Sequence, residues 1–592
     1  MSVFSKIRQN FIVAIFVRVY GVLSIGQRRK AVLLTILSIL GALAEVVGLA
    51  ALGAVMLAAT DHGFVKSNRI MVWLYNLGGF GSEAHFMVFL SVTLLLIFVL
   101  KNVFALYLYH FQAKFAYDVG SDLSKRMLIK FYNRGFTFFK NTNSADIQNQ
   151  VMNIPIFFSS SIMISAINFF VESLVVLLVV LGIALHDWRL FLGLVTVMLP
   201  TGLLIYTLTK NKLYHLGQGQ ALMYNKVFNK LNQAVFGYTD VRIHNKEHVF
   251  MKDYSDLIQT YNRSHQARFV LTLVPPRALE VISIVGISIT FIYTYIFIGD
   301  PSQVYQFIAI FAAAAFRILP AFSRILVAVM GMRSHQYCLD YLEDGKLPES
   351  LDKSEVTSMK FEESIEFRNL DFAFEESENP ALKKVSFKVM KGEKIGIIGE
   401  SGSGKTTLMN ILLRFLDEKS GGMYVDGKQL HRDDKASWRA LLGYVKQDVF
   451  LMDATLAENV AFGEKPNEID HTRLIAALEQ ASLMRHVETL PEGVNTIVGE
   501  YGSKISGGQK QRIGIARALY AGAKVLVFDE ATSSLDTETE QAITESIESI
   551  SGGHTIFVIA HRISTLRFCD RIFEMKNGEL VGEFSYDQIL NR

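Results

Sequence analysis

Six long apolar runs lie within the first 332 residues of this 592-residue chain. Each is long enough to cross a bilayer as a helix, which takes about 20 residues. Hydrophobic residues make up 50% of the chain and the mean hydropathy is +0.28, which excludes an ordinary soluble protein. We therefore predict an all-α membrane domain of six helices, at residues 31–60, 86–110, 162–185, 190–209, 278–298 and 304–332.

The pattern changes after the sixth run. Short β-rich segments then alternate with amphipathic helical segments, as in KIGIIGE (394–400) followed by TTLMNILLRFL (406–416). This alternation is typical of a soluble α/β domain. Residues 343–360 are polar and poor in aromatics, which favours a linker. We expect a membrane domain over residues 1–342, then this linker, then an α/β domain over residues 361–592.

Basic residues are unevenly distributed among the loops. Because cytoplasmic loops carry an excess of positive charge, the chain is predicted to be a multi-pass protein of the cell inner (cytoplasmic) membrane, with both termini and the soluble domain in the cytoplasm. Lys and Arg number six, six and nine in residues 1–30, 111–152 and 210–268, against two, one and none in residues 61–85, 186–189 and 299–303.

Several segments outside the spans carry their own signals. Residues 1–30 contain no acid, and Phe4–Leu23 favours a helix that lies at the inner membrane interface. The two long cytoplasmic loops have turn-forming tips near residues 141–149 and 236–245. These tips either contact the soluble domain or are solvated hairpins.

Charge and cysteine content exclude some classes of function. The formal net charge of +3 is small, so we expect no nucleic-acid partner. Cys338 and Cys569 are the only cysteines, too few for a disulfide scaffold or a tetrahedral cysteine zinc site.

Residues 399–406, GESGSGKT, fit the P-loop pattern G-x-x-x-x-G-K-[ST]. A strand-like segment precedes them and a helical segment follows, which is the context that a P-loop requires. Backbone N–H groups of such a loop bind phosphates, the lysine reaches the β- and γ-phosphates, and Thr406 can bind Mg²⁺. The predicted ATP-binding residues of this segment are Gly399, Ser401, Gly402, Ser403, Gly404, Lys405, Thr406 and Thr407.

A second apolar strand, VLVF (525–528), ends in Asp529 and Glu530. At the carboxyl end of a parallel strand these acids face the phosphate crevice. Asp529 is therefore predicted to bind Mg²⁺, and Glu530 to polarise the water that attacks ATP. ATP and Mg²⁺ are the cofactors that we expect.

Further motifs carry a family resemblance. Gln447 in YVKQD, ISGGQ (505–509), SSLD (533–536) and His561 in IAHR follow in the order that resembles the ATP-binding cassette of ABC transporters. The resemblance covers about residues 365–585. Six spans before one cassette resemble the half-transporter form of ABC exporters. The resemblance implies an ATP hydrolase coupled to transmembrane transport.

The same resemblance implies roles for single residues. Phe374 stands where an aromatic ring, more often Tyr, stacks on adenine. Gln447 contacts Mg²⁺ and the water, and His561 holds the γ-phosphate. The remaining implied ATP-binding residues act between subunits: Ser506, Gly507, Gly508 and Gln509 bind the nucleotide held by the other subunit, and Asp536 links the two sites.

Each motif occurs once. If ISGGQ (505–509), the signature motif, acts across subunits, the chain therefore needs a second chain to complete a site. Because Glu530 and His561 are both present, a homodimer is the simplest assembly. A heterodimer with another half-transporter is the alternative.

Four cations lie in or beside the predicted spans: Lys101, Arg277, Arg317 and Arg324. An ionisable residue at the bilayer centre is costly and usually faces a cavity or a partner. Either these cations bind substrate or they pair with Glu45, Glu172 and Glu280. Three acids against four cations leave one cation in excess per chain.

A second resemblance concerns the cargo. VPPRALE (274–280), FRILPAFSRIL (316–326) and Lys101 in FVLKNVFALYLYHF are similar to the lipid-linked oligosaccharide flippases among the ABC exporters, and residues 62–80 are expected to include a small external helix. This resemblance implies a polyprenyl-diphosphate oligosaccharide as substrate. The alternative is a multidrug or peptide exporter. An importer is disfavoured because the spans precede the cassette on one chain, and a non-transport ATPase would not need them.

Overall fold

The structure is a computed structural model. It describes residues 11–60, 64–186, 188–297, 301–343, 347–348, 350–351, 359–374, 379–530, 537–550, 553–560 and 562–591. The chain divides into two compact units. The first comprises Met1–Arg134 and Asn141–Leu351, and the second comprises Gly135–Lys140 and Asp352–Arg592.

Long helices make up the first unit, and each predicted apolar run falls on one of them. Among the described residues, three helical stretches are long and apolar enough to cross a membrane: Ile25–Met56, Glu83–Asn141 and Ser144–Gly182. The predicted all-α membrane domain is confirmed. The long helices are α3 (Ile25–Thr60), α6 (Glu83–Asn141), α9 (Ile164–His186), α10 (Trp188–Phe236), α12 (Glu247–Phe297) and α13 (Pro301–Ser334).

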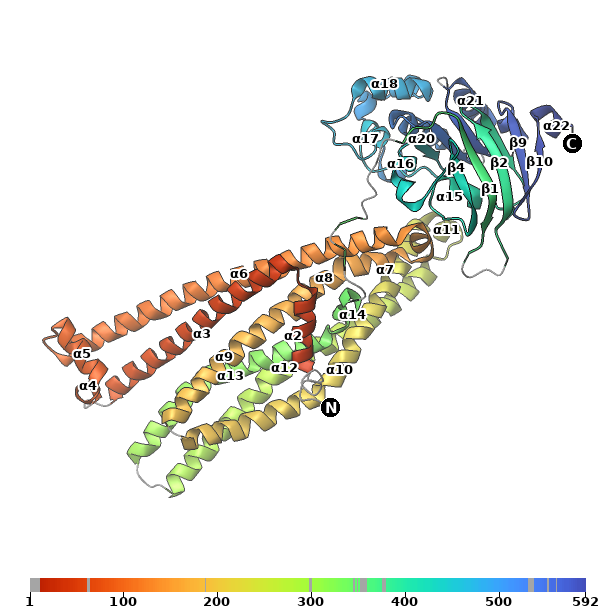
Figure 1. Ribbon diagram of the computed structural model, residues 1–592. Coiled ribbons are helices and arrows are strands. Elements are labelled where there is room, and N and C mark those ends of the chain that lie inside the picture. Colours follow the sequence, from red (N-terminus) through yellow and green to blue (C-terminus); the bar gives the residue numbers. More distant parts are fainter. Residues whose placement is uncertain are drawn as a thin grey trace. The chain divides into compact units, whose positions relative to one another are not determined.

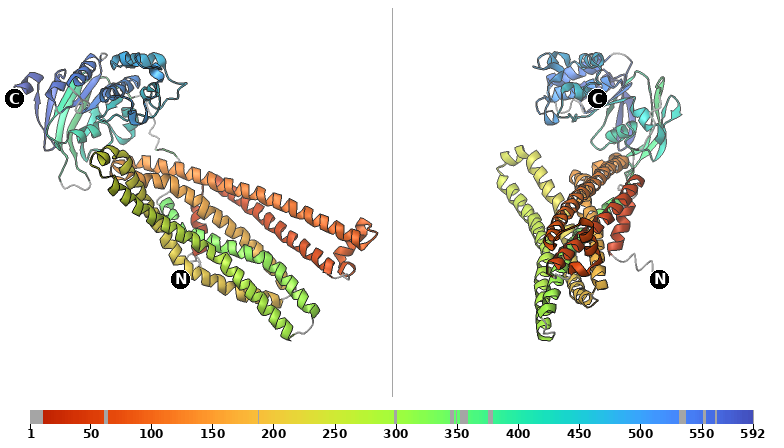
Figure 2. Two further views of the ribbon diagram at one scale, coloured as in Figure 1. Left: turned by 180° about the vertical axis from the view of Figure 1, so that it is seen from behind. Right: turned by 90° about the vertical axis from the view of Figure 1, so that its left-hand side faces the viewer.

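Helices α3 and α6 run side by side (Figures 1 and 2). Their connection forms α4 (Phe64–Ser67) and α5 (Arg69–Gly78), so a helix forms within residues 62–80 as predicted. The side chain of Asn68 accepts hydrogen bonds from two N–H groups of the first turn of α5, and Gly79 ends the helix in the left-handed conformation. These are the residue types that favour helix ends.

Close helix contacts hold the rest of the first unit together. A Cβ atom on Gly217 of α10 would lie 1.7 Å from the carbonyl oxygen of Ser334 on α13, so only glycine permits this approach. Between the first two long helices and α9 lie short elements, two of them π-helical. They are α7 (Ser144–Gln148), η1 (Asn149–Asn153), α8 (Ile154–Phe157) and η2 (Phe158–Met163).

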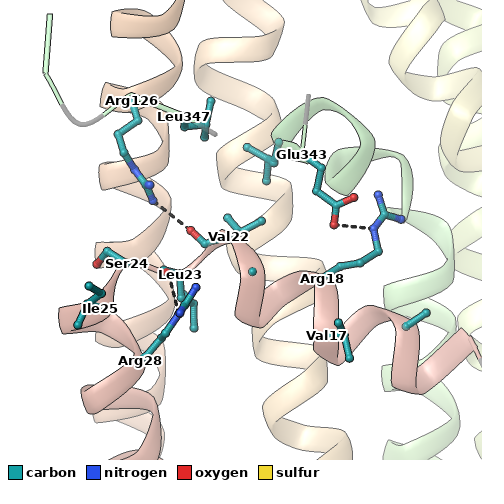
Figure 3. A pocket seen from close by; sticks show the side chains of 13 residues that line it. Val17, Arg18, Val22, Leu23, Ser24, Ile25, Arg28, Arg126, Glu343 and Leu347 are labelled. Atoms are coloured by element: carbon teal, nitrogen blue, oxygen red, sulfur yellow. Dashed lines mark hydrogen bonds and ion pairs between the residues drawn. The ribbon is translucent and has the colours of Figure 1, made fainter. Parts of the chain in front are cut away.

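The predicted interfacial helix corresponds to α2 (Phe11–Val22), and the first ten residues lie outside the described ones. Arg18 of α2 donates to Glu343 at 2.7 Å and to Asp340 at 2.7 Å, which attaches α2 to α14 (Tyr337–Glu343). Figure 3 shows the Arg18–Glu343 bond and, across the same pocket, Arg126 donating to the carbonyl oxygen of Val22.

Two sheets form the second unit. The first is antiparallel in the order β2-β1-β4-β5, and the second has the order β10-β9-β3-β8-β7-β6 with parallel pairing from β9 to β6. The strands are β1 (Ser364–Phe372), β2 (Leu382–Met390), β3 (Lys394–Ile398), β4 (Ser420–Val425), β5 (Lys428–Gln429), β6 (Leu442–Val445), β7 (Val525–Asp529), β8 (Thr555–Ile559), β9 (Arg571–Lys576) and β10 (Glu579–Phe584).

Helices accompany these strands, which confirms the predicted α/β fold of the C-terminal domain. Central strands such as β7 and β8 are buried along almost their whole length, which explains their uninterrupted apolar sequences. The helices are α15 (Lys405–Leu412), α16 (Lys435–Arg439), α17 (Leu456–Val460), α18 (His471–Gln480), α19 (Met484–Val487), α20 (Gly507–Tyr520), α21 (Thr537–Ser549) and α22 (Tyr586–Leu590).

Candidate nucleotide site and intramembrane charges

Four neighbouring parallel strands bring the predicted nucleotide residues to one edge of the larger sheet. The P-loop follows β3, and Gln447 comes two residues after β6. Asp529 ends β7, and His561 comes two residues after β8. Since parallel strands have their carboxyl ends at the same edge, the carboxyl ends of these four strands lie side by side there.

The P-loop backbone depends on its glycines. Gly399, Gly402 and Gly404 have φ values of 149°, 81° and 104°, which L side chains rarely adopt. A Cβ atom on Gly399 would lie 2.2 Å from the carbonyl oxygen of Met575. The hydroxyl oxygen of Ser403 is buried and has no hydrogen-bond partner among the described residues. Such a loop, with an orphaned hydroxyl, fits a phosphate ligand.

Lys405 begins α15, and its side chain folds back over the loop. Its Nζ donates to the carbonyl oxygens of Gly399 at 2.8 Å and of Glu400 at 2.9 Å. Burial lowers the pKa of Lys405, although the acids Glu530 and Asp529 act in the opposite direction. Thr406 and Thr407 follow in the first turn of the same helix, where N–H groups point toward bound anions.

Asp529 has a partner that the motif pattern did not reveal. The hydroxyl of Tyr444 on β6 donates to Asp529 Oδ2 at 2.9 Å. Burial and the neighbouring Glu530 raise the pKa of Asp529, while this hydrogen bond and nearby lysines lower it, with a net rise. Glu530 has a φ of 51°, and its N–H donates to the carbonyl oxygen of Ile559 on β8. A left-handed glutamate is uncommon, and such backbone conformations are concentrated at functional sites.

A side chain of α20 holds the backbone around Gln447 in place. Gln511 is buried, and its Nε2 donates to the carbonyl oxygens of Lys446 at 3.1 Å and of Gln447. The Gln447 side chain is exposed. Gln511 lies in KQR (510–512), directly after the signature motif. This position is the one sequence signal that pointed to Gln511.

The signature residues form the start of α20. Ser506 is the N-cap, and it exchanges hydrogen bonds with Gln509 in a capping box. Gln509 also contacts His486 Nδ1 at 3.2 Å. Ser506 and Gly507 are exposed and Gly508 is buried. An exposed helix N-terminus of this length can receive an anion from outside the chain.

Of the other predicted nucleotide residues, one follows a strand of the smaller sheet and two lie outside the described residues. Phe374 follows β1, is 38% exposed and meets the ring of Phe372 edge-on at 5.0 Å between centroids. Asp536 and His561 lie outside the described residues. Beside His561, Arg562 forms an ion pair with the buried Glu540 of α21.

Three of the four intramembrane cations have acidic partners. Arg324 of α13 binds both carboxylate oxygens of Glu172 on α9, from Nε at 2.6 Å and Nη2 at 3.1 Å. Arg317 lies in α13, and its side chain falls outside the described ones. Besides the Arg324–Glu172 pair, Lys101 pairs with Glu45 at 3.1 Å and Arg277 pairs with Glu280 at 2.9 Å.

A P-loop sheet with these motifs on one edge, on the same chain as membrane-spanning helices, defines an ATP-driven membrane transporter. The ABC transporter family model matches residues 382–533. The ATP-dependent lipid A-core flippase of Burkholderia orbicola (strain AU 1054) is 32% identical over 79% of this chain and 78% of that protein. The flippase of the same name from Polaromonas sp. (strain JS666 / ATCC BAA-500) is 29% identical over 92% and 91%.

The fold matches that of a bacterial Atm1-family ABC exporter with ATP bound, with a TM-score of 0.76 and 22% identity over 95% of this chain and 97% of that one. The chain belongs to the ABC exporters, as a half-transporter in which membrane helices and one ATP-binding cassette share a chain. It is a multi-pass membrane protein with a cytoplasmic cassette that binds ATP and couples its hydrolysis to transport.

Proposed function

We propose that this protein is an ATP-driven flippase of the inner membrane, and that it moves an anionic lipid-linked substrate of the polyprenyl-diphosphate oligosaccharide class. Relatives named lipid A-core flippases support a lipid cargo. The observation that carries the proposal is the charge in and beside the spans, where four cations stand against three acids. Each chain therefore holds one positive charge in excess in or beside the spans, which an anionic headgroup can offset.

The cassette residues take the following roles in this proposal. Lys405 and the P-loop N–H groups bind the phosphates, and Thr406, Gln447 and Asp529 hold Mg²⁺. Glu530 polarises the water and His561 contacts the γ-phosphate, while Phe374 stacks on adenine. The chain acts as a homodimer in which Ser506 to Gln509 and Asp536 of one subunit complete the site of the other.

Arg317 is the proposed principal headgroup contact, with Lys101, Arg277 and Arg324 contributing positive charge around it. The apolar tail stays in the bilayer, so only the headgroup crosses the cavity. Charge-assisted hydrogen bonds to a diphosphate are about twice as strong as neutral ones. Because of this difference, the protein selects lipids with a diphosphate headgroup over uncharged lipids.

The test is Arg317→Ala in reconstituted vesicles, with ATP hydrolysis and translocation of a polyprenyl-diphosphate oligosaccharide measured separately. Loss of translocation with continued hydrolysis supports the proposal. Undiminished translocation contradicts it, and a parallel loss of hydrolysis and thermal stability indicates a structural ion pair instead. Lys252→Ala, an exposed charge of α12 outside the predicted spans, is the matched control. Stimulation of hydrolysis by amphipathic drugs or peptides alone would favour the alternative exporter function.

A further inference from the structure

A pocket of about 580 Å³ with both polar and apolar lining residues lies among η2, α9, α10, α12 and α13 of the first unit. This volume is typical of small-molecule sites. Its polar lining includes Ser160, Ser161 and Ser165 from the η2–α9 segment, His265 and Arg268 from α12, and Ser334 and His335 from the end of α13. None of the lining residues is Asp or Glu.

The pocket lies at the cytoplasmic ends of the spans. Its α12 residues precede the predicted span at residues 278–298, and Ser334 and His335 follow the span at residues 304–332. Along the helices it lies on the cytoplasmic side of Arg277 and Arg317. A headgroup from the inner leaflet would reach this level first.

Arg268 supplies positive charge to the pocket. Its side chain is partly buried, and no carboxylate forms an ion pair with it among the described residues. Burial lowers its pKa, and the hydroxyls of Tyr337 and Tyr261 act against this effect. Since arginines withdrawn from water are normally paired, this charge favours an anionic ligand.

His335 holds Arg268 in place. Arg268 Nη1 lies 2.6 Å from His335 Nε2, and His335 Nδ1 lies 3.2 Å from the carbonyl oxygen of Gly331. Because the guanidinium can only donate, Nε2 accepts and Nδ1 carries the proton. Burial, with Arg268 nearby, lowers the pKa of His335 to about 4, so the imidazole stays neutral near pH 7.

Two further polar atoms at the pocket lack partners. The hydroxyl of Ser334 and Nε2 of His265 are buried without a hydrogen-bond partner among the described residues. Buried polar atoms are nearly always satisfied, so both atoms are candidate hydrogen-bonding partners for a ligand. The serines Ser160 and Ser161 come from the π-helical turn η2, a feature often found at functional sites.

We propose that this pocket is a loading site for a phosphate-bearing group, with Arg268 as its charged contact and His265 and the serines as hydrogen-bonding partners. The proposal rests on the proposed flippase function and adds to it a first binding step at the cytoplasmic ends of the helices. The same chemistry suits a lipid headgroup or a free phosphate compound. The experiment below distinguishes these two sources.

The test measures equilibrium binding of radiolabelled farnesyl diphosphate to the purified full-length protein in dodecyl maltoside, a detergent without phosphate. The parent and every variant also carry Lys405→Ala and Arg317→Ala, so that neither the P-loop nor the proposed headgroup contact contributes much diphosphate binding. Arg268→Gln is expected to weaken binding about tenfold to hundredfold, the range for losing a charged hydrogen bond. Arg268→Lys should lose less, because it keeps the charge.

Arg263→Gln is the matched control, since Arg263 is exposed on the same helix, and it should bind farnesyl diphosphate like the parent. Farnesol should not compete. Competition by inorganic diphosphate as strong as that by unlabelled farnesyl diphosphate assigns the site to free phosphate compounds, and weaker competition assigns it to lipid headgroups.

Parent-like binding by Arg268→Gln, competition by farnesol, or no binding by the parent would overturn the proposal. If Arg268→Gln fails to fold by gel filtration, His265→Ala serves instead, with binding at least about threefold weaker expected and parent-like binding contradicting the site. Arg268-dependent binding in a protein that does not flip polyprenyl-diphosphate oligosaccharides would sustain the pocket and reject only the proposed cargo.

Discussion

At the scale of single residues, the nucleotide edge depends on side chains that do not belong to the motifs themselves. Tyr444 donates to Asp529, and Gln511 donates to the backbone on both sides of the bond that joins Lys446 and Gln447. Both are positioning residues, since each acts through a residue that is predicted to bind Mg²⁺. They reduce the conformational freedom of that residue before ATP arrives, which lowers the entropic cost of assembling the site.

Glu530→Gln tests the role of the second acid of β7. We expect the variant to bind ATP and to hydrolyse it at least about 100-fold more slowly, because positioning or deprotonating the water contributes roughly 10² to 10⁴ in rate. Phosphate release and equilibrium ATP binding are measured together. Lys405→Ala provides the contrast, since it should weaken ATP binding itself. Near-normal turnover by Glu530→Gln would remove Glu530 from this role.

At the scale of secondary-structure elements, ion pairs connect helices that are far apart in sequence. The Arg324–Glu172 pair joins α13 to α9 with two hydrogen bonds, and the Glu172 side chain is only 7% exposed. A carboxylate withdrawn from water in this way needs its partner. This pair therefore contributes to helix packing whether or not Arg324 also meets substrate.

Glu172→Gln should destabilise the membrane domain by roughly 1–3 kcal/mol, because it leaves the guanidinium without its bidentate acceptor. The measurement is the thermal unfolding midpoint of the purified protein in detergent. Asp253→Asn is the control: it breaks the Lys230–Asp253 pair between α10 and α12, in which the acid is 48% exposed, and should cost less than about 1 kcal/mol. Equal shifts of the unfolding midpoint for the two variants would show that the Glu172 pair stabilises the domain no more than the exposed pair does.

At the scale of the whole molecule, the single set of motifs makes the subunit arrangement testable. Ser506 caps α20 at an exposed helix start, where a second chain can present its nucleotide. If the signature acts across subunits, the distribution of lesions between the two chains decides how many complete sites remain.

A dimer of one Lys405→Ala chain and one Ser506→Ala chain should keep one complete site. Both lesions then fall in the same composite site, and the other composite site is unchanged. A dimer with both lesions in one chain and none in the other should keep no complete site. ATP occlusion in purified mixed dimers measures the difference. Equal occlusion in the two arrangements would contradict a signature that acts across subunits.

The sequence by itself determined the six apolar runs, the P-loop and the α/β class of the C-terminal domain. The physical reason is that these features are local: about 20 apolar residues span a bilayer, and phosphates are bound by consecutive backbone N–H groups. The tertiary structure alone decided that Arg324 meets Glu172, that Tyr444 meets Asp529, and that Arg268 and His335 share a pocket with the serines of η2. Helical periodicity places a residue on a face of its helix, but which residue it meets depends on how distant segments pack together.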